Sequence, residues 1–322
     1  MAGKSYREGL ALLQIADMFA NEDDAREWLE TKRWPDGVTC PRCGSANIVK
    51  TTHPTQTHRC RDCRKAGNPN QFNVKTDSIM ENSNIKCRVW AIGVYLFATN
   101  IKGISSMRLH RELGIGQKAA WFMLHRLREA AKSETEIDFS GPVEVDETYM
   151  GGKRKNMSNS RRKELTGRGA VGKSAIVGMK DRETNEVRTK VIDSPDKDTL
   201  QAFVENNADQ DAKVYTDGAT AYDGLPFDHE SVNHSVSEYV RDQAHTNGIE
   251  SHWALLKRGY HGIYHKMSPK HLQRYVNEFA GRHNDRKLNT IEQMNKIVQG
   301  MSGKRLRYAD LISDNGLKSG AR

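Results

Sequence analysis

The pattern of apolar and polar positions divides the chain into helical and strand-like regions. Residues 9–33 and 85–133 carry apolar side chains at the spacing that predicts amphipathic helices. In the first region Asn21 is the expected N-cap, because three acidic residues follow it in what would be the first helical turn. From Pro142 onward short runs with strand character appear, and helices return near His245.

The run VEVDETYMGG, residues 143–152, is the first of the predicted strands. Side chains alternate between the two faces of a strand, which places Glu147 on the face of Val143 and Val145. The same alternation places Asp146 on the opposite, polar face. Only one of the two neighbouring acids can therefore face a given site, and Asp146 is the better candidate for a working carboxylate.

Three more strands and one helix are predicted beyond this run. The strands are SAIVGM, EVRTKVID and AKVYTDG, and the helix DKDTLQAFVENN precedes the last of them. Asp217 ends the fourth strand of this order. If the first and fourth strands are neighbours, as in a ribonuclease H-like sheet, Asp146 and Asp217 meet at one end of it. Two such carboxylates can share a magnesium ion, which prefers oxygen ligands.

A third acid comes from the motif HTNGIESHWALLKRG, which has helical spacing. Ile249, Trp253 and Leu256 recur along one stripe, which predicts a buried face. Glu250 and Lys257 have the same spacing one step around the helix, so they should share a face about 10 Å apart along the axis. A carboxylate there could reach a metal while the ammonium group reaches a nearby phosphate.

Four of the five cysteines form the pairs CPRC and CRDC, with sixteen residues between the pairs. Two CxxC turns complete a closed tetrahedral zinc site, which holds a fold and does not catalyse. The expected zinc ligands are Cys40, Cys43, Cys60 and Cys63. His53 and His58 lie between the pairs and are expected at the surface, whereas Cys87 is expected to be a buried apolar residue. Basic residues around the pairs favour DNA contact with this zinc ribbon.

Residues 102–130 have the pattern of a helix-turn-helix. Leu109 and Leu113 mark the inner face of the first helix, residues 114–116 form the turn, and residues 119–127 form the second helix. An ordinary helical hairpin in a basic protein is the alternative. On the outward face of the second helix we expect the DNA contacts Gln117, Lys118, His125, Arg126 and Arg128.

A basic loop rich in glycine and serine, residues 151–169, separates the first two strands. It is either a solvated loop or a DNA clamp that orders on binding. The DNA contacts expected from this loop and from the helix of the third acid are Lys153, Arg154, Lys155, Arg161, Arg162, Lys257 and Arg258.

The overall charge agrees with a polyanionic partner. The 322 residues carry a net charge of +9, and 28% of them are charged, which points to nucleic acid first. The sequence contains no run of about 18 apolar residues, and its first ten residues lack the apolar centre of a signal peptide. We therefore expect a cytoplasmic protein with no membrane partner.

Together these motifs resemble the bacterial insertion-sequence DDE transposases that join an N-terminal zinc ribbon to a ribonuclease H-like catalytic domain. The matching segments lie between about residues 20 and 290: RWPDG, the two CxxC pairs, VEVDETYMGGK, YTDGATAY, HTNGIESHWALLKRG and HLQRYVNEFAGRHNDR. The resemblance implies that Asp146, Asp217 and Glu250 are a metal-binding triad followed by the basic residue Lys257. Some relatives have Asn as the third residue, so Asn247 is the alternative to Glu250.

The expected fold is multidomain α+β. It comprises an N-terminal helical segment at 1–35, a zinc ribbon at 36–80, a helix-turn-helix at 85–135, a ribonuclease H-like α/β catalytic domain with a mixed sheet at 140–300, and a polar, loosely ordered tail at 303–322.

The expected function is transposition of an insertion sequence. Two magnesium or manganese ions, with Asp146 as the shared ligand, would support cleavage at the element ends and joining of the freed 3′ hydroxyl to target DNA. The expected partners are the terminal inverted repeats, the target DNA and, by family resemblance, further copies of the chain in at least a dimer at the nucleoid. A DNA-binding regulator with an inactive catalytic domain and a metal-dependent nuclease without strand transfer are the alternatives.

Overall fold

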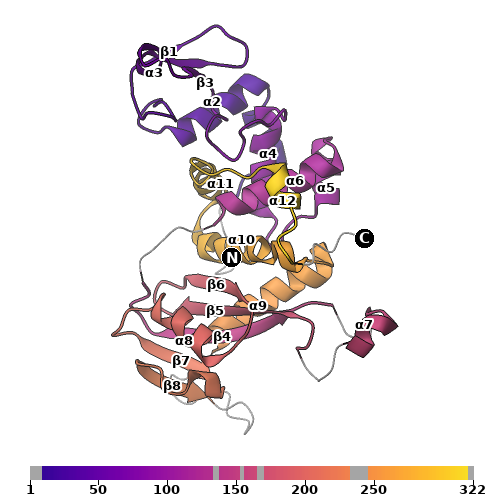
Figure 1. Ribbon diagram of the computed structural model, residues 1–322. Coiled ribbons are helices and arrows are strands. Elements are labelled where there is room, and N and C mark those ends of the chain that lie inside the picture. Colours follow the sequence, from indigo (N-terminus) through magenta and orange to yellow (C-terminus); the bar gives the residue numbers. More distant parts are fainter. Residues whose placement is uncertain (1–8, 133–137, 153–155, 165–169, 233–245, 318–322) are drawn as a thin grey trace, which may run out of the picture. The chain divides into compact units, whose positions relative to one another are not determined.

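The computed structural model describes residues 9–132, 138–152, 156–164, 170–232 and 246–317 (Figure 1). The chain divides into two compact units. The N-terminal unit comprises residues 1–132 and 285–314, and the sheet unit comprises residues 133–284 and 315–322. The sheet unit therefore ends earlier than the expected boundary at residue 300, because residues 285–314 return to the N-terminal unit.

Helices that share one apolar core build most of the N-terminal unit. Asn21 caps the second helix as expected, since its side chain accepts hydrogen bonds from the backbone N–H groups of Asp23 and Asp24. Leu29, Trp90 and many other buried residues form the core. The helices are α1 (Leu12–Met18), α2 (Glu22–Arg33), α4 (Cys87–Thr99), α5 (Ser106–Leu113), α6 (Gln117–Ala130), α11 (Thr290–Gln299) and α12 (Tyr308–Ile312).

A small three-stranded sheet forms the cysteine region of this unit. Its order is β1-β2-β3, with antiparallel neighbours, and helix α3 follows the second strand directly. Phe72 and three cysteines form a separate small core there. The elements are β1 (Ile48–Lys50), β2 (His58–Cys60), α3 (Arg61–Lys65) and β3 (Gln71–Phe72).

Helices α5 and α6 lie where the two helices of residues 102–130 were expected, but the outward face assigned to α6 is wrong for three residues. His125, Arg126 and Arg128 are buried. The Arg126 guanidinium donates to the carbonyl oxygens of Leu306 and Glu81 and lies 4.1 Å from the ring centroid of Phe122. The expected outward position of these three side chains is therefore wrong, and DNA contact by them stays a prediction that nothing in the structure supports.

The segment that follows α11 explains part of this burial. Leu306 and Leu311 are buried, and the Tyr308 ring packs edge-on against Phe122 of α6 at a centroid distance of 5.5 Å. Lys304 donates to the carbonyl oxygen of Glu129 at the end of α6. The expectation of a loosely ordered tail from residue 303 is therefore wrong up to α12, and residues 318–322 lie outside the described residues.

The sheet unit is built on one five-stranded mixed sheet with the order β6-β5-β4-β7-β8. Strand β4 pairs antiparallel with β5 and parallel with β7, so the first and fourth strands are neighbours, as expected. A fifth strand, which the sequence pattern did not predict, pairs parallel with the fourth. The strands are β4 (Val143–Met150), β5 (Ser174–Asp181), β6 (Val187–Ile192), β7 (Lys213–Asp217) and β8 (Asp228–Val232).

Helices cover both faces of this sheet. Val143, Val145 and Val214 share one core with the helix that connects β6 to β7. Ile176 and Val187, on the other face, share a core with the two long helices that follow β8. The helices of the whole sheet unit are α7 (Asn159–Glu164), none of whose described residues belongs to these two cores, α8 (Lys197–Glu205), α9 (Asn247–Gly259) and α10 (Leu272–Asn284), with shorter helical turns at η2 (Thr220–Tyr222), η4 (Tyr260–Tyr264) and η5 (Pro269–His271). No helix in the described part of the chain combines the length and the apolar character needed to cross a bilayer.

Candidate active site and zinc ribbon

Three carboxylates gather where β4 and β7 run side by side. The parallel ladder pairs Glu144 with Tyr215, and two residues further along each strand lie Asp146 and Asp217. Equal steps from a paired position keep side chains on the same face of a sheet. One oxygen each of Asp146, Glu147 and Asp217 lie within 4.8 Å of one another. The expected approach of Asp146 to Asp217 is therefore observed.

Glu147 joins this cluster although the alternation rule assigned it to the opposite face. Its Oε1 atom accepts a hydrogen bond from the hydroxyl group of Tyr222, which is fully buried in the apolar core on that face. Strand β4 continues at Glu147, where it pairs with Val177 of β5, so Glu147 does point to that face. The β4–β7 ladder ends before this position, however, and beyond the end of that ladder an acid on either face can approach Asp217. The sequence signal that could have indicated Glu147 is Tyr222 itself, five residues after Asp217 in the motif YTDGATAY.

The electrostatics of the cluster favour a bound cation. Burial first, and then the nearby charges of Glu147, Asp217 and Glu250, raise the pKa of Asp146 to about 7. Burial also raises the pKa of Glu147 to about 7, although the hydrogen bond from Tyr222 opposes the shift. Carboxylates this close repel one another unless protons or metal ions neutralise them. An all-oxygen donor set of this kind fits magnesium or manganese.

Trp253, on helix α9, donates a hydrogen bond to Asp146. Its indole Nε1–H donates to Asp146 Oδ2 at 3.0 Å, and its ring is 3% exposed. Gly178 lies opposite Asp146 in the β4–β5 ladder. A Cβ atom at Gly178 would come within 2.5 Å of the Trp253 ring. The missing side chain therefore makes room for the indole that contacts Asp146.

Glu144, on the same strand as Asp146, binds the N-terminal end of α9. Its Oε2 atom accepts the backbone N–H of Ile249 at 2.9 Å, and its Oε1 atom accepts Nε–H of Arg182 at 2.9 Å. Glu144 is 2% exposed, so this is a buried acid paired with a cation and with the N-terminus of a helix, where negative charge is favourable. Glu144, the first acid of VEVDE, thus has a structural role that the sequence did not indicate.

Glu250 and Lys257 are exposed on α9, whereas the expected stripe of Ile249, Trp253 and Leu256 is buried. Glu250 lies near enough to contribute to the raised pKa of Asp146, but the set of three close carboxylates does not include it. Asn247, the alternative third residue, is exposed at the first position of α9. Membership of the triad stays a prediction for both.

The four predicted cysteine ligands converge in the zinc ribbon. The Sγ–Sγ distances are 3.7 Å from Cys40 to Cys63, 3.6 Å from Cys43 to Cys60 and 3.4 Å from Cys43 to Cys63. Zinc–sulfur bonds of about 2.3 Å in a tetrahedron require about 3.8 Å between sulfurs. The backbone N–H of Cys63 also helps to lower the pKa of Cys60 to about 7, which favours the thiolate that zinc binds. The sulfur positions therefore fit a structural zinc ion.

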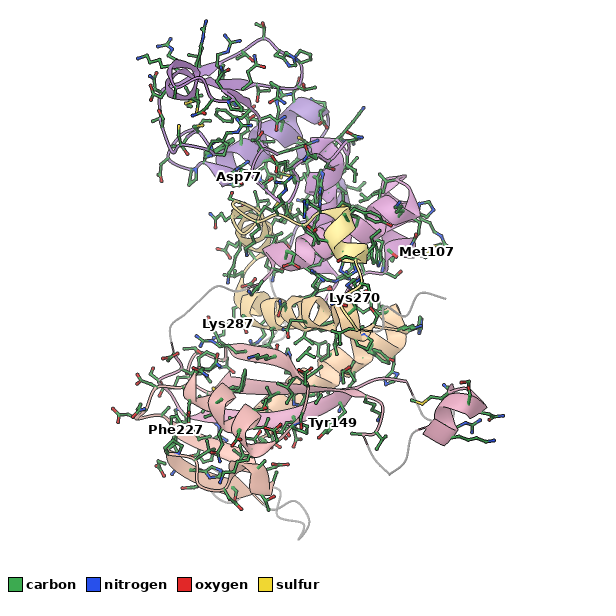
Figure 2. The ribbon with its side chains drawn as sticks, in the orientation of Figure 1. Asp77, Met107, Tyr149, Phe227, Lys270 and Lys287 are labelled. Carbon is green, nitrogen blue, oxygen red and sulfur yellow. The ribbon has the colours of Figure 1, made fainter. Side chains whose placement is uncertain are left out.

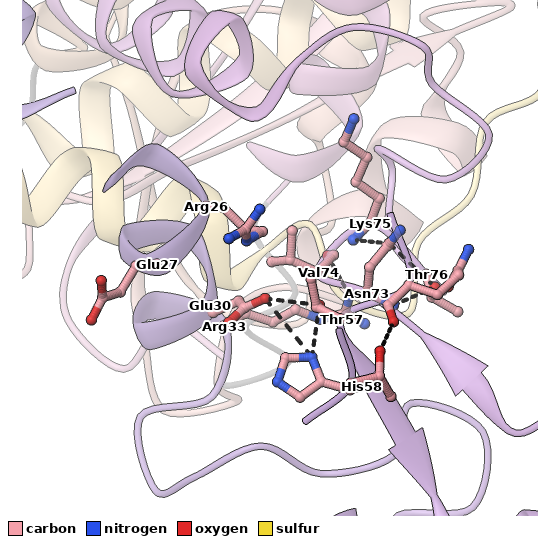
Figure 3. Close-up of polar contacts among 12 residues, drawn as sticks. Arg26, Glu27, Glu30, Arg33, Thr57, His58, Asn73, Val74, Lys75 and Thr76 are labelled. Carbon is pink, nitrogen blue, oxygen red and sulfur yellow. Dashed lines mark hydrogen bonds and ion pairs between the residues drawn. The ribbon is translucent and has the colours of Figure 1, made fainter. Parts of the chain in front are cut away.

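Figure 3 shows where the zinc ribbon contacts α2. His58 is buried, contrary to the surface position expected for it, and its ring stacks on Phe72 at a centroid distance of 5.5 Å. The Thr57 hydroxyl donates to Glu30 of α2 at 3.3 Å, and burial raises the pKa of this carboxyl group. Arg33, also on α2, donates to the carbonyl oxygen of Val74 at 2.6 Å. The ribbon is therefore anchored on a helix of its own unit.

The remaining predicted DNA contacts are mostly exposed. Gln117 and Lys118 are exposed at the start of α6, where the Lys118 ammonium lies 4.3 Å from the Tyr308 ring centroid. Figure 2 shows the side chains of the neighbouring α5, where Met107 is 46% exposed. Arg162, Lys257 and Arg258 are also exposed, Arg161 belongs to α7, and Lys153, Arg154 and Lys155 lie outside the described residues.

Comparisons with known proteins agree with this organisation. Models of a transposase zinc-ribbon domain and of an ISXO2-like transposase domain match residues 20–66 and 138–284, respectively. A Halobacterium salinarum protein named "Uncharacterized protein in transposable element ISH50" is 30% identical over 254 residues, which cover 74% of this chain and 83% of that protein. The zinc ribbon and the sheet unit thus both have transposase counterparts. The chain belongs to the ISXO2-like transposase family, which confirms the resemblance to insertion-sequence transposases.

Proposed function

We propose that the protein is a DNA transposase that cleaves the ends of its own insertion sequence and joins them to target DNA. The observation that carries this proposal is the meeting of Asp146 and Asp217 on parallel strands within the transposase domain. The strand order β6-β5-β4-β7-β8, with only the β4–β7 and β7–β8 pairs parallel, supports a ribonuclease H-like fold for the sheet unit.

In the proposed site Asp146, Asp217 and Glu250 would hold two ions, with Asp146 as the shared ligand and Asp217 and Glu250 as the outer ligands. Magnesium, when bound, lowers the pKa of an attacking hydroxyl group and neutralises charge on the phosphate. Trp253 keeps the Asp146 carboxylate in one orientation through its hydrogen bond. Lys257, exposed on the same helix as Glu250, would hold a DNA phosphate.

The reaction consists of two in-line displacements at phosphorus. In the first, water attacks the phosphodiester at an element end, and the bond to the 3′ oxygen breaks to release a 3′ hydroxyl. In the second, that hydroxyl attacks a phosphodiester of the target and a target oxygen leaves. Each step forms one P–O bond and breaks another, so strand transfer needs no external energy source.

DNA recognition is proposed for the N-terminal unit. The net charge of +9 and the exposed basic side chains of Arg42, Lys50, Arg61, Arg64 and Lys65 on the zinc ribbon support binding to the terminal inverted repeats. Gln117 and Lys118 at the start of α6 would add contacts from a helix-turn-helix. Joining of two ends would require at least a dimer on DNA.

A strand-transfer assay tests the proposal. Labelled DNA from the flanks of the gene, a target plasmid, magnesium and the full-length protein are combined for the wild type, for Asp146→Ala and for the exposed control Glu205→Ala. Joined products from the wild type and the control alone would support a transposase. Cleaved but never joined ends would favour the nuclease, and DNA binding without cleavage in every variant would favour the regulator.

A further inference from the structure

We infer that Glu147 is a further metal ligand of the active site and that Tyr222 is the residue that positions it. This inference rests on the proposed function, because it assigns a residue to the same ion site. It adds a carboxylate to the Asp146, Asp217 and Glu250 set implied by the family resemblance.

The first observation is the position of the Glu147 carboxylate. Among the described residues, the close carboxylates of this unit are those of Asp146, Glu147 and Asp217, with ligand oxygens within 4.8 Å of one another. Glu250 is exposed on α9 and does not belong to this set. In this structure, therefore, the third acid nearest to the two strand aspartates comes from β4 itself and not from the helix.

The second observation is the hydroxyl group that holds Glu147. Tyr222 is fully buried on η2, so its hydroxyl needs a partner inside the protein, and it donates to Glu147 Oε1. A carboxylate has two oxygens, each with two acceptor positions, so Oε2 keeps its capacity to bind an ion. A fixed donor on one oxygen is the usual way in which proteins orient a ligating carboxylate.

Glu147 and Tyr222 both lie close in the sequence to one of the two aspartates. Glu147 follows Asp146 directly on β4, and Tyr222 lies on η2, five residues after Asp217 at the end of β7. The connection after β7 brings Tyr222 back into the core beside Val143 and Val145. The same two segments that bring the aspartates together therefore also bring the donor to its acid.

Manganese binding, which does not depend on DNA chemistry, tests the inference. The electron paramagnetic resonance signal of free Mn²⁺ is titrated with full-length, zinc-loaded protein at pH 7.5. Glu147→Gln is expected to weaken Mn²⁺ binding at least tenfold, and Tyr222→Phe is expected to weaken it to a smaller extent, because the carboxylate stays but loses its orientation. Asp146→Asn is the reference for a lost ligand.

Matched controls separate a ligand role from a structural one. Tyr264→Phe removes a similar hydrogen bond, from Tyr264 to Glu278, and Glu205→Gln neutralises an exposed acid; both should bind Mn²⁺ like the wild type. If Glu147→Gln unfolds, as judged by near-ultraviolet circular dichroism, Glu147→Asp and Tyr222→Phe carry the test. These two are expected to remain folded and to bind Mn²⁺ more weakly.

The outcomes distinguish the inference from the proposed function. Wild-type affinity in folded Glu147→Gln and Tyr222→Phe, with loss in Asp146→Asn, would overturn the ligand role of Glu147 and leave the metal site in place. Absence of Mn²⁺ binding by the wild type would contradict the proposed function itself.

Discussion

The indole N–H of Trp253 donates a hydrogen bond to Oδ2 of Asp146 at 3.0 Å, and this bond ties helix α9 to strand β4. The same helix presents Glu250 and Lys257 on its exposed face. The buried Trp253 ring therefore orients Asp146 and links it to the helix that carries Glu250 and Lys257, two more of the predicted site residues. A hydrogen bond of this kind is what proteins give to a ligating carboxylate, which is the role proposed for Asp146.

Replacement of Trp253 by Phe keeps an aromatic ring in the core and removes the donor. Strand transfer is expected to fall about 10–100-fold, the usual effect of losing a hydrogen bond to a metal ligand, while the protein stays folded. Trp90→Phe is the matched control, because Trp90 is buried in the N-terminal unit and donates to Ser83. Equal joined product from Trp253→Phe and Trp90→Phe would argue against an orienting role.

Gly178 is predicted to be intolerant of any side chain. Gly178→Ala forces the Trp253 ring to move, because its Cβ would lie 2.5 Å from that ring, and overpacking of this kind costs about 1–3 kcal/mol. The midpoint of thermal unfolding should drop accordingly. At Gly262, by contrast, a Cβ would meet no described atom within 4 Å, so Gly262→Ala should unfold near the wild-type temperature. A drop of similar size in both variants would contradict this explanation.

The raised pKa of Asp146, about 7, predicts how stability depends on pH in magnesium-free buffer. The ordinary pKa of an aspartate side chain is 3.8, so between about pH 4 and pH 7 the folded state binds more protons than the unfolded state. The stability contribution of this carboxyl group is therefore present below about pH 4 and is lost as the pH rises through 7. Added magnesium should restore stability at pH 8 more than at pH 5.

The comparison that checks this prediction is the unfolding midpoint of the wild type and of Asp146→Asn from pH 4.5 to pH 8. The variant cannot ionise at this position, so its advantage over the wild type should grow with pH. A difference between the two proteins that is constant with pH would mean that Asp146 ionises as easily in the folded chain as in the unfolded one.

The zinc content of single-cysteine variants is predicted to differ between Cys43, inside the cysteine cluster, and Cys87, outside it. Cys43→Ala removes one of the four converging sulfurs and is expected to lose bound zinc and the folded ribbon, because a structural zinc site supplies folding energy directly. Cys87 is buried in α4 outside this cluster, so Cys87→Ala should retain the zinc of the wild type. Elemental analysis of both purified variants decides the point, and retained zinc in Cys43→Ala would exclude Cys43 as a required ligand.

Much of the sheet unit could be predicted from periodicity and order. Alternation along β4 and the position of Asp217 at the end of β7 placed the two aspartates together once the first and fourth strands were taken as neighbours, as in a ribonuclease H-like sheet. The spacing of Ile249, Trp253 and Leu256 was sufficient to define the buried face of α9. The helix stripe follows from a local rule, whereas the strand neighbours had to be assumed from a known fold.

The failures concern contacts between segments far apart in the chain. Glu147 was excluded because it lies on the opposite face of β4 from Asp146, but the β4–β7 ladder ends before it, and there acids from both faces approach Asp217. Arg126 was expected on the surface because the apolar residues of α6 form one stripe, which predicts a single buried face, and Arg126 lies outside that stripe. The sequence did not reveal that Leu306 and Tyr308, in a mostly polar segment, cover another part of that helix. Strand β8 was missed because DHESV has too few apolar residues to show alternation.

The central claim is that Asp146 and Asp217 act as one site for DNA end joining. The most direct measurement compares joined product from Asp146→Asn, Asp217→Asn and the exposed control Glu205→Gln, each at the protein concentration that gives equal binding to labelled element ends. Normal product is expected from Glu205→Gln and none from either aspartate variant, although both still bind DNA. Joined product from Asp217→Asn at the level of the wild type would mean that Asp217 is not required for joining, and that Asp146 and Asp217 do not act together.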